Sequence, residues 1–526
     1  MLIKQTVFIH SGKEATDMGY MRTATVYINE GHPLFPYADN LTALTNNLSN
    51  AARFRQRQVL SAVSKEKAGW TANEREVMEE IRKTVPLMKK ASMPTKEKHF
   101  LGYMFLEGIL RVNHNPDFYA EGLPRQTAQH VLKTAVKDMK GFYKAIKEYH
   151  KNPDRFTGQP ELPGYKRKGG HSTALVTNQD CTVKTCGGKW YAYFPHAKDK
   201  PVCLGYSIPN ARLKQACITT DNGRYKLSFQ FEVDADIPKV PENIRPERIC
   251  AIDFGVDNLM SVTNNCGLPS LIYKGGVAKS INQKYNKTIA ALVSEQTLRT
   301  GEKFLPDAAY HTATNRRNDQ ISDFMRKCAK HFVTWCVENR IDTVVMGVNK
   351  YWKQETDLGK RNNQNFVQLP FDRMRNIIRY LCAWKGICCL DQEESYTSKA
   401  SFLDRDFIPV CGNEKGKPSF SGQRRPVSYK GMYKKDGFRG LYTTKSGQII
   451  NSDLNGSENI LRKAFPNAFT GKPAPDFNHV VIIRHPDAEN IKNNRKKQTA
   501  VQKQDSHAKI KRQHRKDAKR AKHPAA

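Results

Sequence analysis

The sequence lacks a long hydrophobic run. No stretch approaches the roughly 18 consecutive apolar residues that a membrane span needs. The first ten residues, M-L-I-K-Q-T-V-F-I-H, also lack the apolar segment of a signal peptide. We therefore expect a cytoplasmic protein without a membrane partner.

Paired cysteines are also missing. The chain has 12 cysteines, but no two of them form a C-x-x-C pair, and their spacings suggest no disulfide framework. This pattern does not support a zinc ribbon, whose ligands come in closely spaced pairs. We expect free thiols in a reducing compartment and no bound zinc.

Acidic residues are scarce relative to basic ones. The 526 residues include 86 Lys and Arg but only 51 Asp and Glu, which gives a formal net charge of +35. Such an excess favours a polyanionic partner, and nucleic acid is the leading candidate, although surface charge can also serve solubility alone. A hydrophobic fraction of 39% allows a sizeable core, and the length suggests two to four domains.

The N-terminal part changes its hydrophobic period twice. Residues 1–30 alternate in the manner of strands, residues 31–150 have helical periodicity, and the strand pattern returns over residues 165–245. This order predicts a β-barrel, formed by 1–30 and 165–245, that carries an inserted helical lobe. Basic side chains in this part, at Arg53, Lys166, Arg167 and Lys168, are candidate nucleic-acid contacts.

The C-terminal part alternates strands and helices. We predict strands at 249–252, 259–263, 341–347 and 386–390, with helices at 315–339 and 374–384 between them. Strands connected through helices pair in parallel and form an α/β layer. Residues 246–400 and 448–485 would make up this domain.

Three acidic positions follow predicted strands or open a helix. Asp253 ends the strand at 249–252, Glu393 and Glu394 follow the strand at 386–390, and Asp453 begins a helix near 452. An isolated acid of this kind is often a helix cap or a salt-bridge partner. A buried carboxylate otherwise needs a neutralising partner, and hard oxygen ligands suit Mg²⁺, with Mn²⁺ as an alternative.

Three motifs resemble those of TnpB-type proteins and the related type V CRISPR effectors. A-I-D-F-G-V-D-N-L-M-S-V-T (251–263) is similar to their first RuvC motif, and N-S-D-L-N-G-S-E-N-I (451–460) to the third. G-Q-P-E-L-P-G-Y-K-R-K (158–168) resembles the segment that precedes their second barrel half. The resemblance implies an RNase H-like (RuvC) nuclease domain beside the N-terminal barrel.

The same resemblance implies a function and partners. It predicts a transposon-type, RNA-guided DNA endonuclease that binds a guide RNA and double-stranded target DNA, as a monomer or a homodimer. Asp253, Glu394 and Asp453 would be its catalytic residues and would hold Mg²⁺. Such a prokaryotic protein would act at the nucleoid.

The middle acid departs from the common pattern. Members of this family usually carry a glutamate directly after the V-V-V strand, where this chain has Gly347. Some relatives, the eukaryotic Fanzor proteins among them, carry a replacement glutamate before a T-S pair, and Glu394-Ser395-Tyr396-Thr397-Ser398 resembles that arrangement. We therefore favour Glu394 over Glu393.

The usual four-cysteine zinc ribbon is the second departure. Residues 401–447 hold only Cys411, so we expect a reduced target-nucleic-acid-binding insertion without zinc, in which Arg424 and Arg425 contact nucleic acid. Lys353 is a further candidate contact. The basic segment 486–526 is predicted to be a disordered tail.

Two other functions remain open on the sequence alone. Gly347 is compatible with a nuclease-dead, RNA-guided DNA-binding regulator, although the acids at 253, 394 and 453 favour an active enzyme. A transposase that acts directly on DNA ends, without a guide, is the third alternative.

Overall fold

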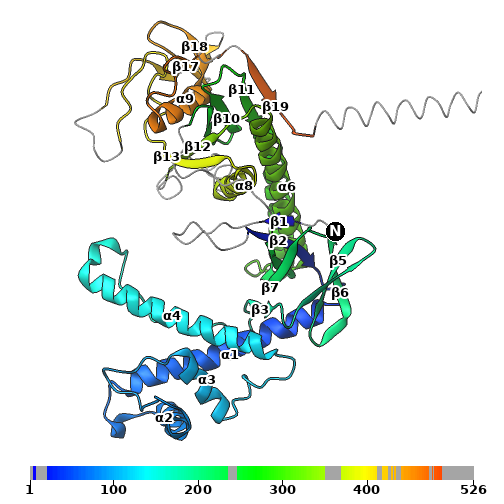
Figure 1. Cartoon of the computed structure of the whole chain (residues 1–526), viewed down its shortest axis with the longest axis vertical. Coiled ribbons are helices and arrows are strands. Elements are labelled where there is room, and N and C mark those ends of the chain that lie inside the picture. Colours follow the sequence, from blue (N-terminus) through cyan, green and yellow to red (C-terminus); the bar gives the residue numbers. More distant parts are fainter. Residues whose placement is uncertain are drawn as a thin grey trace, which may run out of the picture. The chain divides into compact units, whose positions relative to one another are not determined.

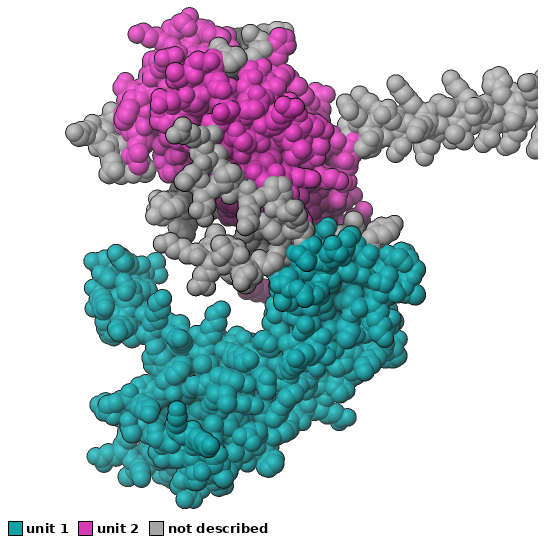
Figure 2. Space-filling view, in the orientation of Figure 1, with its two compact units in different colours: residues 1–236 teal, residues 237–526 magenta. Residues whose placement is uncertain are grey.

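The chain divides into two compact units, residues 1–236 and residues 237–526, shown in different colours in Figure 2. The computed structural model describes residues 4–6, 20–234, 246–349, 369–410, 418–424, 428–429, 432–433, 440–472, 477 and 479–487. Each unit has its own core and is described separately below.

Unit 1 contains two antiparallel sheets. The larger sheet has the strand order β1-β2-β8-β7-β3, and the smaller has the order β4-β5-β6. The strands are β1 (Lys4–Thr6), β2 (Tyr20–Ile28), β3 (Ala174–Thr177), β4 (Thr182–Cys186), β5 (Lys189–Phe194), β6 (Ala197–Tyr206), β7 (Ala211–Asp221) and β8 (Arg224–Val233). β8 is the central strand of the larger sheet, and it forms long antiparallel ladders with β2 on one side and β7 on the other.

The closed barrel expected from the sequence is not confirmed. Among the described strands, the larger sheet is open, with β1 and β3 at its edges. Aromatic contacts join the two sheets instead: the ring centroids of Trp190 and Phe231 lie 4.8 Å apart, and those of Phe194 and Phe229 lie 6.0 Å apart. The core is therefore covered by packing one sheet on the other, and strand periodicity does not distinguish this from barrel closure.

The helical lobe is inserted between β2 and β3, as the sequence indicates. Its helices are α1 (Phe35–Ala62), α2 (Ala72–Thr84), α3 (Tyr103–Val112) and α4 (Arg125–Lys151), drawn in blue to cyan in Figure 1. Short 3₁₀ turns at Lys67–Gly69, Val85–Leu87 and Pro153–Arg155 complete it. Leu48, Val59, Ile81, Leu106 and Leu132 are fully buried in the common core of these helices.

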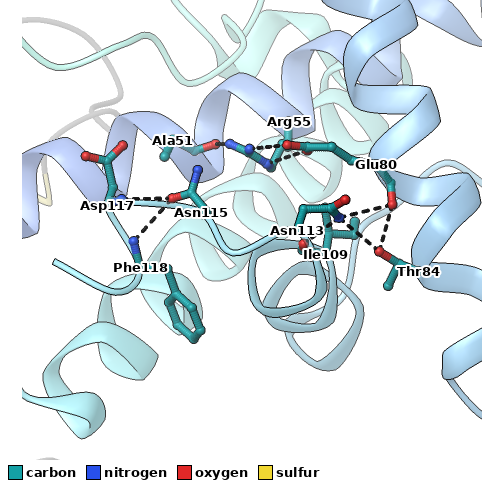
Figure 3. A network of polar contacts seen from close by, with 9 residues as sticks. All are labelled: Ala51, Arg55, Glu80, Thr84, Ile109, Asn113, Asn115, Asp117 and Phe118. Carbon is teal, nitrogen blue, oxygen red and sulfur yellow. Dashed lines mark hydrogen bonds and ion pairs between the residues drawn. The ribbon is translucent and has the colours of Figure 1, made fainter.

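A buried ion pair ties α1 to α2 within this lobe (Figure 3). The Arg55 guanidinium donates two hydrogen bonds to the Glu80 carboxylate, at 2.8 and 2.6 Å, and a third to the carbonyl oxygen of Ala51. The Arg55 side chain is only 7% exposed. Asn113 extends the network from α3 by donating to the Glu80 carbonyl oxygen and the Thr84 hydroxyl.

Breaking this pair is expected to destabilise unit 1. E80A leaves the Arg55 guanidinium buried without its anion, which costs about 3–5 kcal/mol. The matched control is E79A, because the neighbouring Glu79–Arg82 pair lies on the surface, where such pairs contribute at most about 1 kcal/mol. Urea unfolding followed by circular dichroism measures both; equal losses for the two variants would contradict the prediction.

Unit 2 is built on a six-stranded mixed sheet with the order β13-β12-β9-β10-β11-β19. The strands are β9 (Ile249–Asp253), β10 (Asn258–Asn264), β11 (Ser270–Lys274), β12 (Thr343–Val348), β13 (Cys388–Glu393) and β19 (Val480–Ile483). β9, β10 and β11 form an antiparallel meander, and β12 and β13 add in parallel on the other side of β9. A three-stranded meander flanked by two parallel strands is the topology of RNase H-like domains, as predicted.

Helices cover both faces of this sheet. They are α5 (Gly276–Thr300), α6 (Ala308–Glu338), α8 (Phe371–Ala383) and α9 (Ser452–Ala464), and Figure 1 shows α6 and α9 in this unit. Cys250 and Ile252 of β9 pack in one core with α6 and α8, whereas Ile249 and Ala251 pack in a second core with α9. Because successive side chains on a strand point to opposite faces, Asp253 follows Ala251 onto the α9 face.

Some elements of unit 2 were not predicted. β11 and α5 occupy a region whose polar and basic composition gives no clear period, and β19 pairs in parallel with β11 although it lies far away in the sequence. Short strands lie in the insertion before α9, namely β14 (Gln423–Arg424), β15 (Ser428–Tyr429), β16 (Met432–Tyr433), β17 (Leu441–Thr443) and β18 (Ile449–Asn451). No helix in the described part of the chain is both long and apolar enough to cross a membrane.

Candidate functional site

Asp253 lies at the last position of the central strand β9. Its neighbour in the antiparallel ladder is Ser261 of β10. The space around its carboxylate is limited by α9: a Cβ atom at Gly456 would lie 2.7 Å from Asp253 Oδ2. The helix can therefore approach the end of β9 only because residue 456 has no side chain.

Glu394 occupies the space that a side chain at position 347 would need. Gly347 lies on β12, next to β9, and its α9-facing side is close to Ile460. A Cβ atom there would lie 2.6 Å from Glu394 Oε2 and 2.7 Å from Ile460 Cδ1. Glu394 follows β13 and is anchored by a hydrogen bond from its amide to the carbonyl oxygen of Val348. The Glu394 carboxylate thus lies beside the position that the Cβ atom of a glutamate at residue 347, as in the common pattern, would occupy.

Asp453 is held in the first turn of α9. The side chain of Asn451 caps the helix by accepting hydrogen bonds from the amides of Asp453 and Leu454, at 2.9 and 3.1 Å. Asn258 donates to Asp453 Oδ2 at 2.7 Å and accepts from the Lys274 ammonium at 2.7 Å. A carboxylate at a helix N-terminus is also favoured by the helix dipole. These contacts fix the orientation of Asp453.

Two asparagines of α9 attach the Glu394 loop to the helix. Asn455 donates to the carbonyl oxygen of Ala400 and accepts from the amide of Phe402. Asn459, one turn later on the same face, donates to the carbonyl oxygens of Thr397 and Ala400, at 2.9 and 2.7 Å. The motif D-x-N-x-x-x-N therefore supplies one acidic residue and positions the loop that carries another.

The three acidic residues line one pocket of about 400 Å³. Polar groups dominate the rest of its wall, which comprises Phe254, Gly255, Val256, Asp257, Asn258, Asn349, Ser395, Tyr396, Thr397, Ser398 and Arg424. Tyr396 has a φ of +67°, which is strained for a residue with a bulky side chain. This strain lies two residues after Glu394, in the turn that directs its side chain.

The pocket concentrates negative charge. Burial, together with the carboxylates of Glu394 and Asp453, raises the pKa of Asp253 well above its usual range, and Arg424 opposes the rise. Burial also raises the pKa of Glu394 to about 7, against the opposing effect of the Arg375 guanidinium. Arg424 Nη2 lies 3.5 Å from Asp453 Oδ1, at the outer limit of a hydrogen bond. The pocket therefore favours a cation.

The donor set fits a hard divalent cation. Mg²⁺ prefers carboxylate oxygens and keeps several waters, so three carboxylates around an open pocket suit it chemically. Within the described residues, no three His, Cys, Asp or Glu side chains are already close enough together to hold a metal ion. The fit thus rests on the type of donors and on the mutual repulsion that helps to raise the pKa of Asp253.

Glu393 has a different environment from Glu394. Its carboxylate accepts a hydrogen bond from Lys463 at 2.6 Å and another from the amide of Ser395. These contacts lower its pKa despite partial burial, which acts in the opposite direction. Glu393 does not line the pocket, so the structure brings Glu394 rather than Glu393 together with Asp253 and Asp453.

The predicted basic contacts fall into four groups. Arg53 and Lys166 have partners within unit 1, since Arg53 pairs with Asp138 at 2.7 Å and Lys166 donates to the Ser172 hydroxyl at 2.8 Å. Arg167 and Lys168 are exposed, and Arg424 lines the carboxylate pocket. The remaining two, Lys353 and Arg425, lie outside the described residues.

Several residues of this site were not identified from the sequence. Asn258 is part of the first motif, F-G-V-D-N, but nothing in its spacing indicates that it contacts Asp453. Arg375, only 7% exposed on α8, reaches the carbonyl oxygen of Gly347 at 3.5 Å. A buried arginine on an amphipathic helix looks like a surface residue in the sequence, so only the fold reveals it.

Glu458 is a further acidic residue of α9, and it is fully buried. Neither of its carboxyl oxygens has a hydrogen bond of normal geometry within the described part of the chain. Burial raises its pKa well above the ordinary 4.5, although the hydroxyl of Thr263 lies close enough to oppose part of the shift. Folding therefore disfavours ionisation of Glu458, whereas the unfolded chain ionises it with an ordinary pKa.

This difference predicts a pH-dependent stability. Below about pH 4.5 the carboxyl is neutral in both states, and as pH rises toward the folded-state pKa, ionisation stabilises only the unfolded chain. E458Q removes the titration, so its melting temperature should exceed that of the wild type at pH 8 by several degrees and approach it at pH 5. The exposed Glu338 supplies the control, E338Q; a difference for E458Q that does not change with pH would contradict the prediction.

The topology and the acidic pocket together define an RNase H-like domain with a carboxylate site at the end of its central strand. Residues 228–353 match the model of a family described as "Probable transposase" (OrfB_IS605). This match includes Asp253 and confirms the resemblance to TnpB-type proteins. It ends before Glu394 and Asp453, and a comparison with curated proteins finds no match.

Solved structures with a similar chain come from RNA-guided effectors. A Cas12f1–sgRNA–target DNA complex is 13% identical, with a TM-score of 0.40 over 79% of this chain and 82% of that one. The mini-RNA-guided endonuclease CRISPR-Cas_phi3 is 9% identical, with a TM-score of 0.39 over 87% and 93%. Alicyclobacillus acidoterrestris C2c1 with single-guide RNA is 7% identical, with a TM-score of 0.29 over 79% and 70%.

Proposed function

We propose that this protein is an RNA-guided DNA endonuclease that hydrolyses phosphodiester bonds at the carboxylate pocket of unit 2. The observation that carries the proposal is the convergence of Asp253, Glu394 and Asp453, which come from three distant segments, on one pocket. Guide RNA would select the target by base pairing, and the protein would bind double-stranded DNA next to it. The net charge of +35 supports polyanionic partners. The protein would act in the cytoplasm at the nucleoid.

In this proposal Asp253, Glu394 and Asp453 would hold Mg²⁺ or Mn²⁺. The bound metal would activate a water molecule and stabilise the leaving oxygen. Asn258 keeps the Asp453 carboxylate oriented, and Asn455 and Asn459 hold the Glu394 loop against α9. Arg424, beside Asp453, would attract the phosphate backbone of the strand to be cut.

The main competing function is a nuclease-dead regulator, for which Gly347 is the supporting observation. The position of Glu394 supports the active enzyme instead, because its carboxylate fills the space beside Gly347 and would supply the third acid of the site. An inactive site would have no need of a buried, mutually repelling carboxylate group, which costs folding stability.

Purified ribonucleoprotein, incubated with a plasmid that carries sequences complementary to the co-purified RNA, tests the proposal. We expect cleavage with Mg²⁺ and none with EDTA. An intact plasmid with a strong gel shift would favour the regulator. Cleavage of DNA ends by protein that carries no RNA would favour the transposase.

A further inference from the structure

The loop formed by residues 163–172, called here the basic loop, is attached along one face of α1. Arg57 donates to the carbonyl oxygen of Pro163 at 3.0 Å, and Asn46 donates to that of Arg167 at 2.9 Å. Asn50, between them, donates to the Lys166 carbonyl oxygen and accepts from the Lys166 amide. The loop therefore runs antiparallel to the helix, and the helix fixes its main chain.

Since the main-chain groups of the basic loop are bound to α1, several of its side chains project outward. Tyr165 is 50% exposed, and Arg167 and Lys168 are exposed as well. A turn closed by a hydrogen bond from the amide of Gly170 to the carbonyl oxygen of Arg167 puts Lys168 near its tip. Gly169 has a φ of +67°, which suits this tight turn. The presentation of these side chains is set in advance by the backbone.

Tyr165 is stacked before any ligand arrives. The Arg57 guanidinium, held by the Pro163 carbonyl oxygen, lies 5.3 Å from the centre of the Tyr165 ring. The cation fixes the ring, and the large exposed fraction leaves room for a second planar group. Unpaired nucleobases stack on aromatic rings and on arginine in this manner.

Positive charge around the ring is poorly compensated. Arg53, Arg57, Lys166, Arg167 and Lys168 cluster along the basic loop and α1, and Asp138 is the one acid that pairs with any of them among the described ion pairs. Burial and the nearby Arg53 guanidinium lower the pKa of Lys166. Such a cluster attracts the phosphate of a nucleic acid.

We propose that the basic loop and Arg57 bind an unpaired nucleotide of the guide RNA. Its base would stack on the Tyr165 ring, and the adjoining phosphates would contact Arg167 and Lys168. The proposal rests on the proposed RNA-guided function, in which the guide provides single-stranded segments and the target enters as a duplex. A base pair in a duplex hides the base face that an exposed tyrosine ring can use. Because the loop's main chain is occupied by α1, binding would depend little on base identity.

The test measures binding of full-length protein to a 20-nucleotide, mixed-sequence, single-stranded RNA, and to DNA of the same sequence as single strand and as duplex. Y165A should weaken RNA binding about 10-fold, as expected for one lost stacking contact, while Y165F stays within twofold of wild type. Duplex binding should change less than twofold. R167A/K168A should weaken RNA binding and reduce its dependence on salt.

The control is Y119A, because Tyr119 is similarly exposed at 47% on the same unit but lies outside the basic loop. Crosslinking of 4-thiouridine RNA to Tyr165 gives a readout that does not depend on affinity. Unchanged RNA binding by a folded Y165A variant would overturn the proposal, as would a loss confined to single-stranded DNA. Failure of this site would appear in protein that still cleaves plasmid with its guide, whereas failure of the proposed function would appear as absent cleavage in the wild type.

Discussion

The D253A variant is expected to lose at least about 10³-fold of the DNA cleavage rate while it keeps its RNA. Asp253 is the acid at the end of the central strand, and it contacts the part of α9 where Gly456 leaves room for its carboxylate. Without it, only two acids, one from a loop and one from the start of a helix, remain to hold the metal. Plasmid cleavage at saturating Mg²⁺, with RNA content measured in the same preparations, tests this.

The matched control for D253A is D257A. Asp257 lines the same pocket but is 84% exposed and pairs with Lys279. We expect D257A to retain cleavage within a few-fold. If D253A cuts at the wild-type rate, the site assignment is wrong. If D253A also loses its RNA, the substitution has affected folding. D253N, which keeps the size of the side chain, then tests whether the negative charge is needed.

The second large effect concerns Glu394 and Gly347. E394A should reduce cleavage by about 10³-fold, because the pocket then loses its third acid. E393Q, the adjacent control, should stay within a few-fold of wild type, since Glu393 bonds to Lys463 outside the pocket. G347A should also impair cleavage, because a methyl group would lie 2.6 Å from the present position of Glu394 Oε2.

A rescue experiment separates the acid from its position in the sequence. In G347E/E394A/I460V the glutamate moves to β12 and the loop carboxylate is removed. The third change, to the shorter valine, removes the Ile460 Cδ1 atom that lies 2.7 Å from the new Cβ. This variant should cleave at least about 10-fold faster than E394A. Cleavage no faster than E394A, in protein that folds and binds RNA normally, would contradict the view that positions 347 and 394 are alternative sources of one carboxylate.

Much of unit 2 could be predicted from its sequence because local patterns coincide with its structure. The apolar run before Asp253, the long periodic helix now seen as α6 and the strand ending at Gly347 each have one plausible structure. Side chains alternate between the two faces of a strand, so the sequence also indicates that Asp253 shares a face of β9 with Ala251. The convergence of three acids was predicted from motif resemblance, and the structure places them in one pocket.

Other features depend on contacts between distant segments. Whether the strands of unit 1 close into a barrel depends on edge pairing, and ring contacts such as Trp190–Phe231 carry no mark in the sequence. β19 pairs with β11 although a long stretch of chain separates them, so its register cannot be read locally. The polar neighbours of the site, Asn258 and Arg375, acquire their roles only through residues that the fold brings to them.

The crowding at Gly347 also affects how nuclease sites are recognised in related protein sequences. A survey that recognises nuclease sites by an acid at the end of β12 would classify this chain as inactive, because position 347 is a glycine. Position 347 and position 394 cannot both carry a glutamate without displacing neighbouring atoms. A change from a glutamate at 347 to one at 394 therefore passes through a sequence with either a crowded or an incomplete site. A glycine at position 347 indicates a missing acid only when the loop after β13 also lacks a glutamate.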